Sequence, residues 1–289
     1  MLGCTYALVA LGMYVPFVLA GTLSMAYSTY AAIGGYAVAI MVAKAGLPAW
    51  FGWCVGPLVS AVLAVLLGWA TRRLSGFYLV AVTLLFAEAF QSWIQSNDNL
   101  TGGEAGFGNL PPVHFFGWSP STVQFGIGAV ALICSIAFLV ERLRFSPWGV
   151  LVRAMREVPE AVEAAGARVP TMQLAALAIG AAIGNLAGAL FVSSVQSVNP
   201  LTFTLSLVFL AVFVPIVGGL GTAWGCLLGA AVITELTLNV HALGQSGMLI
   251  VAVGVLVILL LAPRGVGGLI GSSRTLLVRL AAKSTARNG

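Results

Sequence analysis

The longest uncharged stretch of the chain, residues 169–234, decides the fold class: VPTMQLAALAIGAAIGNLAGALFVSSVQSVNPLTFTLSLVFLAVFVPIVGGLGTAWGCLLGAAVIT. It holds no Asp, Glu, Lys or Arg over 66 residues. A helix needs about 20 apolar residues to cross a bilayer, so this stretch is long enough for roughly three crossings. It offers no charge to a water-facing surface, and it therefore predicts a membrane protein.

The composition of the whole chain agrees with that reading. Of 289 residues, 60% are hydrophobic and 7% are charged, and the mean hydropathy is +1.05. Soluble domains are about 45–50% apolar and about 25% charged. A soluble enzyme, a disordered chain and a nucleic-acid binder are therefore excluded as descriptions of the whole chain. The lipid bilayer is the expected surrounding of the protein.

Long apolar runs without the alternation of a β-barrel predict helices, because backbone in lipid must satisfy its own hydrogen bonds. We predict an all-α integral membrane protein, a polytopic bundle of about eight to nine transmembrane helices, with residues 1–263 as one permease domain. The predicted spans are 4–22, 27–43, 50–70, 76–94, 122–140, 172–192, 203–218, 224–242 and 245–262. Residues 264–289 form a basic tail.

The distribution of Lys and Arg predicts the orientation. Cytoplasmic loops of membrane proteins carry an excess of these residues. Placing residues 72–73, the segment 141–170 and the tail in the cytoplasm puts twelve of the thirteen basic residues inside, with only Lys44 outside. The loop 95–121, which has no Lys or Arg, is then periplasmic.

The N-terminus has two alternative placements in this topology. The first apolar run lacks the basic region of a cleavable signal and is expected to be a retained span. Counting spans back from the tail places the N-terminus outside. Either residues 4–43 contain a re-entrant piece, or a preceding span is missing.

No motif for chemistry on a nucleotide or a metal is present in the sequence. The chain has two lysines and two histidines, and it has no GxxxxGK[ST], no HExxH and no paired Cys/His ligands. Its four cysteines stand alone in apolar runs, where they are small hydrophobes rather than disulfide or metal partners. We expect no catalytic residue, no metal and no cofactor. The sequence shows no set of catalytic groups that would indicate a membrane enzyme.

The segment 141–170, ERLRFSPWGVLVRAMREVPEAVEAAGARVP, is the only charge-dense stretch between spans. Pro159 suits a first helical turn and Gly166 suits a C-terminal stop, so residues 158–165 predict a two-turn helix. A helix this short is unstable alone. It is either an ordinary solvated loop helix or a helix that docks into another protein.

Three further features carry open alternatives. Glu88 and Glu235 lie inside predicted spans, where a carboxylate must face protein or water; they serve either a solute or proton path, or a structural hydrogen bond. Glycines recur every fourth residue at 180, 184 and 188 and again at 221, 225 and 229, which predicts close helix packing. The aromatic loop 95–121 suits a membrane-interface belt or an external docking surface.

With these motifs in place, the chain resembles LivM-type permeases, the membrane subunits of branched-chain amino acid ABC importers. The resemblance is carried in order by LSMAYSTYAAIGGYAVAI at 23–40, GFYLVAVTLLFAEAF at 76–90, TGGEAG at 101–106, RAMREVPEAVEAAGARV at 153–169, GGLGTAWGCLLGA at 218–230 and APRG at 262–265. Ala26 and Tyr27 depart from it, since the family favours Gly followed by Gln or His there. This departure bears on which solute is carried.

The resemblance implies an importer subunit of the bacterial inner membrane that works with two ABC ATPase subunits, a second LivH-like permease and a periplasmic solute-binding protein. It implies that the segment 141–170 couples to the ATPase through Arg153, Arg156, Glu157, Glu160, Glu163, Ala164 and Gly166. Candidates for the translocation pathway are Tyr27, Glu88 and Glu235. Candidates for docking of the binding protein are Thr101, Gly102 and Gly103.

The alternative function is an ion- or proton-coupled secondary transporter. Such a carrier needs paired charges at mid-membrane depth, whereas a permease needs a cytoplasmic docking helix. The sequence shows the second feature and lacks the first. It leaves the solute open among branched-chain amino acids, other amino acids, urea and short amides.

Overall fold

A computed structural model describes residues 1–72, 74, 76–112 and 120–241 of the chain. Within these ranges every named element is a helix, and the only β pairing is an isolated bridge between Phe107 and Val198. The elements are α1 (Leu2–Met13), the π-helical η1 (Tyr14–Leu19), α2 (Tyr27–Ala43), α3 (Ala49–Ala70), α4 (Phe77–Ser96), α5 (Asp98–Thr101), the 3₁₀ turn η2 (Gly103–Ala105), α6 (Thr122–Phe145), α7 (Pro147–Glu157), α8 (Pro159–Ala164), α9 (Val169–Val195), the 3₁₀ turn η3 (Pro200–Thr202), α10 (Leu205–Gly218) and α11 (Ala223–His241).

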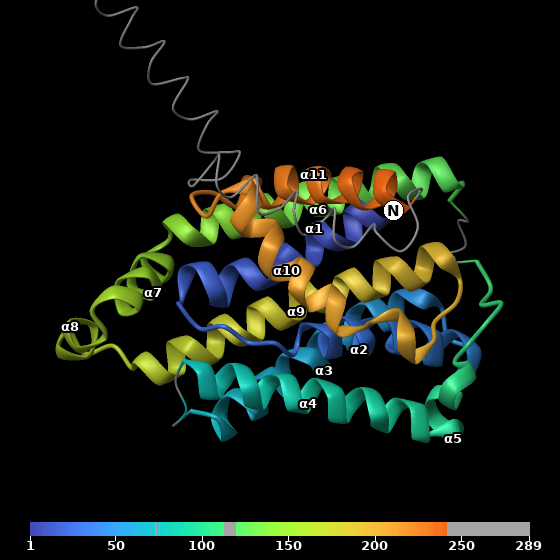
Figure 1. Cartoon of the computed structure of the whole chain (residues 1–289), viewed down its shortest axis with the longest axis horizontal. Helices are drawn as coiled ribbons and strands as arrows, with labels where there is room; N and C mark the ends of the chain where they lie inside the picture. The colour runs from blue at the N-terminus through green and yellow to red at the C-terminus, as the bar shows by residue number, and fades with distance from the viewer. Residues whose placement is uncertain (73, 75, 113–119, 242–289) are drawn as a thin grey trace, which may run out of the picture.

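The long helices lie roughly along one direction, which makes the molecule an elongated bundle (Figure 1). The short helices α7 and α8 extend beyond one end of the bundle, and α5 lies at the other end. We call these the α7–α8 end and the α5 end. In the view of Figure 1, α4 lies on one side of the bundle and α6 and α11 lie on the opposite side.

Six helical stretches are long and apolar enough to cross a membrane: Leu2–Leu19, Ala49–Ala70, Phe77–Ser96, Thr122–Phe145, Val169–Val195 and Pro200–Gly218. Two shorter apolar helices accompany them, Tyr27–Ala43 and Ala223–Thr237. Eight of the predicted spans therefore coincide with helices, while 245–262 lies outside the described residues, as does the tail 264–289. The all-helical membrane fold is confirmed, and a total of eight to nine spans stays a prediction.

The helix α9 forms the centre of the bundle and packs against α1, α2 and α3. Its glycines allow this approach: a Cβ at Gly184 would lie 3.0 Å from the Tyr27 ring, and one at Gly188 would collide with the Ala31 carbonyl oxygen. The glycine stripe at 180, 184 and 188 is thus a packing surface, as predicted. Of the second stripe, Gly225 and Gly229 pack closely on α10, whereas nothing lies within 4 Å of a Cβ built at Gly221.

A buried polar side chain joins three of these helices. Asn185 of α9 is completely buried, and its side-chain nitrogen donates to the Ser60 hydroxyl of α3 at 2.7 Å and to the Tyr30 carbonyl of α2 at 3.2 Å. Hydrogen bonds of this kind hold helices together in lipid, where the hydrophobic effect does not drive helices against one another.

Candidate functional site

The connection between η1 and α2 is extended rather than helical. After η1 the chain makes no helix over residues 20–26, and Gly21 has a φ of +70°. This extended segment is fixed by a hydrogen bond from the Met25 backbone N–H to the Thr83 hydroxyl of α4, at 2.9 Å. Non-helical backbone is tolerated at membrane depth only where it is buried in protein or lines a cavity. The extended segment therefore indicates a candidate site in this part of the bundle.

Tyr27 is the first residue of α2, directly after the extended segment. Its hydroxyl supplies a hydrogen-bond donor that the end of α1 lacks. Pro16 has no N–H, so the carbonyl of Gly12, four residues earlier, loses its usual helical donor. The Tyr27 hydroxyl donates to that carbonyl at 2.9 Å, and the Tyr27 side chain is completely buried. The ring of Tyr30 packs edge-on against it, with centroids 5.4 Å apart. The structure therefore places this predicted pathway residue in a packed helix contact.

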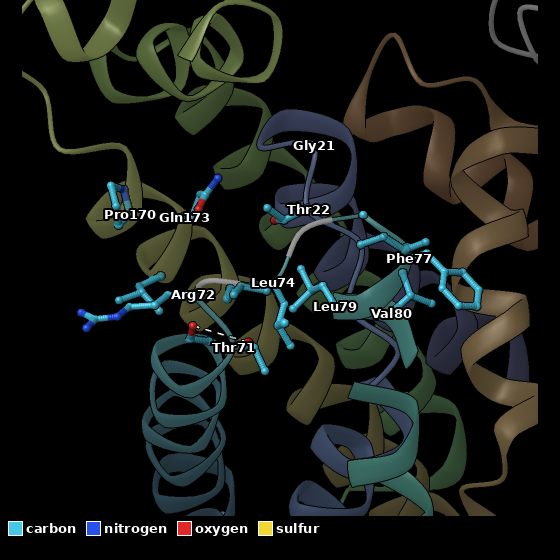
Figure 2. Close-up of a pocket in the computed structure, with 15 residues that line it drawn as sticks. Gly21, Thr22, Thr71, Arg72, Leu74, Phe77, Leu79, Val80, Pro170 and Gln173 are labelled. Carbon is cyan, nitrogen blue, oxygen red and sulfur yellow. Dashed lines mark hydrogen bonds between the residues drawn. The ribbon is translucent and has the colours of Figure 1, made fainter. Parts of the chain in front are cut away.

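A cavity of about 440 Å³ opens at the α7–α8 end (Figure 2). One wall is the extended segment after η1, with Gly21, Thr22 and Leu23. A second wall is the start of α9, with Pro170 and Gln173 among its residues. The remaining wall, between the end of α3 and the start of α4, is lined by Gly68, Thr71, Arg72, Leu74, Gly76, Phe77, Leu79 and Val80.

The predicted short helix exists as α8, Pro159–Ala164, one residue shorter at each end than expected. Gly166 follows with a φ of +88°, as its predicted stop role requires. On α8 only Val162 is buried, at 5% exposure, and it marks the side that turns toward the bundle. Ala161, Ala164 and Ala165 are exposed, as are the predicted coupling residues Glu157, Glu160 and Glu163. A ridge of small side chains is therefore free at the α7–α8 end.

Arg156 on α7 makes a contact that the sequence did not predict. Its Nη1 donates to the Val18 carbonyl in the last turn of η1 at 2.6 Å, over a separation of 138 residues. Its aliphatic stem lies on Gly21, where a Cβ would come within 2.8 Å of the Arg156 Cγ. By contrast, Arg153 bonds only within its own helix, to the Gly149 carbonyl at 3.4 Å.

Two further long-range hydrogen bonds close the same end of the bundle. The Glu141 carboxylate accepts from the Ala223 N–H in the first turn of α11 at 2.7 Å, and it also pairs with Arg144 at 2.8 Å. A carboxylate in this position stabilises a helix N-terminus. The Tyr14 hydroxyl donates to the Leu220 carbonyl at 3.4 Å. The end of α6 is thus joined to the start of α11, and η1 is joined to the turn before α11.

The two predicted carboxylates lie on outward faces rather than in the packed core. Glu88 of α4 and Glu235 of α11 are both exposed in the single chain. Glu88 follows Phe77 by eleven residues, which corresponds to about 17 Å along the helix axis and so to mid-span. Leu85 and Ser92 share its exposed face. The structure does not bring Glu88 or Glu235 together with Tyr27.

Thr101, Gly102 and Gly103 build a tight turn at the α5 end. The Thr101 hydroxyl is buried and donates to the carbonyls of Ile94 and Asn97, at 2.6 and 2.7 Å. Gly102 and Gly103 have φ values of +77° and +58°, which favour glycine. These residues therefore shape the loop, and its exposed positions are neighbours such as Glu104 and Ala105. Among the described residues, no group of His, Cys, Asp and Glu could hold a metal ion.

Sequence reasoning missed the hydrogen bonds of Arg156, Glu141 and Tyr27, and the role of Tyr27 in the pathway stays a prediction. One signal for Tyr27 was available. A proline inside a predicted span leaves a carbonyl without a donor four residues earlier, and Pro16 does so for Gly12. Nothing in the sequence pointed to the partners of Arg156 and Glu141, because each contact joins segments that are far apart along the chain.

Curated relatives point to the same kind of protein. The chain is 29% identical over 252 residues to the high-affinity branched-chain amino acid transport system permease protein LivM of Salmonella typhimurium, and 29% identical over 249 residues to that of Escherichia coli. It is 31% identical over 205 residues to a probable LivM permease of Methanocaldococcus jannaschii. The matches cover 79%, 78% and 65% of this chain and 59%, 59% and 58% of the respective relatives.

The chain thus spans about three fifths of the length of these relatives, and no solved structure matches it. The family described as branched-chain amino acid transport system / permease component matches residues 1–263, which is almost the whole chain. The apolar helices described above fit a multi-pass membrane protein of this kind. The chain belongs to the family of branched-chain amino acid transport permease components.

Proposed function

We propose that this chain is the translocation subunit of an ATP-driven importer, which carries branched-chain amino acids across the bacterial inner membrane. ATP is hydrolysed by partner ABC ATPase subunits, a second LivH-like permease completes the membrane part, and a periplasmic binding protein delivers the solute. The α7–α8 end and the C-terminus face the cytoplasm, and the α5 end faces the periplasm. The distribution of Lys and Arg supports this orientation.

The observation that carries the proposal is the exposed ridge of α8. A six-residue helix is too short to be stable by itself, and here only Val162 anchors its inner side. Ala161, Ala164 and Ala165 remain exposed beyond the end of the bundle (Figure 1). Small side chains let a helix enter a narrow cleft, and Glu160 and Glu163 flank the ridge with charge. This surface suits docking into an ATPase subunit.

Glu88 supports a shared solute path between two permease subunits. An ionised carboxylate at mid-span is costly against lipid, so it must face protein or water. Its face of α4 is exposed in the single chain. We place the second permease, with the path between the two subunits, against this face. A carboxylate there can bind the ammonium group of an amino acid. Glu235, on the exposed face of α11, is the second candidate for the path.

The docking proposal is tested by co-purification of the Ala164→Trp variant with the ATPase subunits. Ala164 is preferred over Gly166 because the φ of +88° at Gly166 makes every side chain there strained, whether or not a partner docks. Ala105→Trp, an exposed alanine at the α5 end, is the control. We expect Ala164→Trp to lose the ATPase subunits and leucine uptake, and Ala105→Trp to retain the ATPase subunits. Retention of both by Ala164→Trp would show that α8 is an ordinary solvated helix.

A further inference from the structure

Two of the three walls of the cavity at the α7–α8 end are joined to the α7–α8 segment. The start of α9, with Pro170 and Gln173, follows α8 directly along the chain. The extended segment, with Gly21 and Thr22, is joined to α7 only through space, and α7 packs against the preceding η1. A movement of α7 and α8 therefore reaches one wall through the backbone and the other wall through side-chain contacts.

Arg156 makes the charged contact between α7 and the wall formed by the extended segment. The last carbonyls of a helix lack intrahelical donors, and a guanidinium near them is favoured both by hydrogen bonding and by the helix dipole. Arg156 donates to Val18 in this position at 2.6 Å. Its stem also covers Gly21, the first lining residue of the wall. One side chain thus holds the end of η1 and the start of the extended segment to α7.

The sequence-based prediction that Arg156 contacts the ATPase concerns a partner protein, and within this chain Arg156 already has the Val18 carbonyl as an acceptor. Its guanidinium donates to a carbonyl of this chain, whereas Glu157, Glu160 and Glu163 are exposed and make no hydrogen bond or ion pair to the described residues. Arg156 is itself exposed, but unlike these carboxylates it reaches across to the bundle, where its Nη1 donates to the Val18 carbonyl and its stem lies on Gly21.

We propose that Arg156 is a positioning residue, which transmits the movement of the ATPase-docked α7–α8 segment to residues 20–23 and so sets the width of the cavity in step with ATP hydrolysis. The inference rests on the proposed function as an ABC permease. It assigns to the cavity the role of the cytoplasmic end of the solute path. Arg156 touches neither the solute nor the ATPase in this scheme.

The test uses the assembled importer, with its second permease and ATPase subunits, in proteoliposomes supplied with binding protein and leucine. Arg156→Gln is compared with Arg142→Gln, an exposed arginine of α6 at the same end of the bundle. We expect Arg156→Gln to keep the ATPase subunits and to hydrolyse ATP within about twofold of wild type, while leucine transported per ATP falls at least tenfold. Arg156→Lys should recover part of this ratio, because an ammonium retains the charge but not the fork of donors. Arg142→Gln should behave as wild type.

A labelling measurement separates transmission from general damage. Thr22→Cys, in a chain whose four native cysteines are replaced by serine, places a thiol in the cavity wall. Its reaction rate with a maleimide should change severalfold between the nucleotide-free and the ATP–vanadate states. Adding Arg156→Gln should abolish that nucleotide dependence. Arg156→Lys, which keeps the charge and an aliphatic stem over Gly21, should retain part of that dependence and serves where Arg156→Gln fails to assemble.

Three results would overturn the inference. Loss of the ATPase subunits from Arg156→Gln would make Arg156 a docking contact. Unchanged leucine transport per ATP, or unchanged nucleotide dependence at Thr22→Cys, would show that the hydrogen bond to Val18 transmits nothing. A wild-type assembly that shows no ATP-dependent leucine uptake refutes the proposed function itself, and it is recognised before any Arg156 variant is compared.

Discussion

Replacing Tyr27 by Phe tests whether this residue serves helix packing or the solute. The change removes the hydroxyl that donates to the Gly12 carbonyl at 2.9 Å and keeps the ring that packs on Tyr30. Because Pro16 cannot supply a helical N–H, the carbonyl then loses that donor in a buried site. Leaving a buried acceptor unsatisfied costs about 1–3 kcal/mol. In a chain of this size, such a loss lowers Tm by on the order of 5 °C.

The measurement is thermal unfolding of the purified subunit in detergent, with Tyr78→Phe as the matched control. Tyr78 is 70% exposed on α4, so the loss of its hydroxyl should leave Tm unchanged. A second background sharpens the test. Pro16→Ala restores the N–H that can bond to Gly12, and Tyr27→Phe should therefore cost much less free energy of unfolding in that background. The two changes are then non-additive, as expected for groups that share one acceptor.

Two outcomes would refute this reasoning. One is a Tyr27→Phe protein whose Tm equals that of the wild type. The other is a cost that is the same with and without Pro16. If Tm is unchanged but leucine uptake by the assembled importer is lost, the hydroxyl acts on the solute path, as the resemblance to LivM-type permeases had suggested.

Three further changes test other parts of the structure. Gly180→Ala should lower Tm, because its Cβ would lie 2.6 Å from the Gly12 carbonyl oxygen and overpacking of this kind costs about 1–3 kcal/mol, whereas Gly128→Ala has nothing within 4 Å and should not lower it. Glu88→Gln should assemble normally and reduce leucine uptake at least tenfold; normal uptake would remove Glu88 from the path. In intact cells and a cysteine-free background, Gly108→Cys should react with an impermeant maleimide and Ser284→Cys should not; the reverse pattern would invert the proposed orientation.

The parts of the fold that depend on local pattern were predictable from the sequence. The apolar runs gave the helices within a few residues, and α8 lies inside its predicted range because Pro159 and Gly166 mark its ends. The glycine stripe of α9 was readable because a four-residue repeat places small side chains on one helix face. Each of these signals lies within a single helix, and so the physics that produces it is local.

The parts of the site that depend on contacts between distant segments were not predictable. The spacing of Arg156 within its segment was compatible with a partner protein or with this chain, and only the fold brings it to Val18. Glu141 likewise showed only a charge near the end of a span, with no sign that it would reach Ala223. An arginine or a glutamate forms a hydrogen bond with whichever backbone carbonyl or N–H lies beside it. The packing of the whole bundle decides which group that is.

The exposed faces of the helices raise a further question, namely which of them contacts lipid and which contacts another protein. Leu58, Val62 and Ile127 are each more than half exposed on α3 and α6, and in a bilayer such side chains need no protein partner. Apolar exposure therefore cannot tell a lipid-facing surface from an interface. An exposed carboxylate can distinguish the two kinds of surface, because lipid does not solvate it. Glu88 sits at mid-span on the exposed face of α4, beside Leu85. We therefore expect the proposed second permease to lie against that face rather than against the more uniformly apolar faces of α3 and α6, and by the same argument Glu235 makes the exposed face of α11 a second candidate.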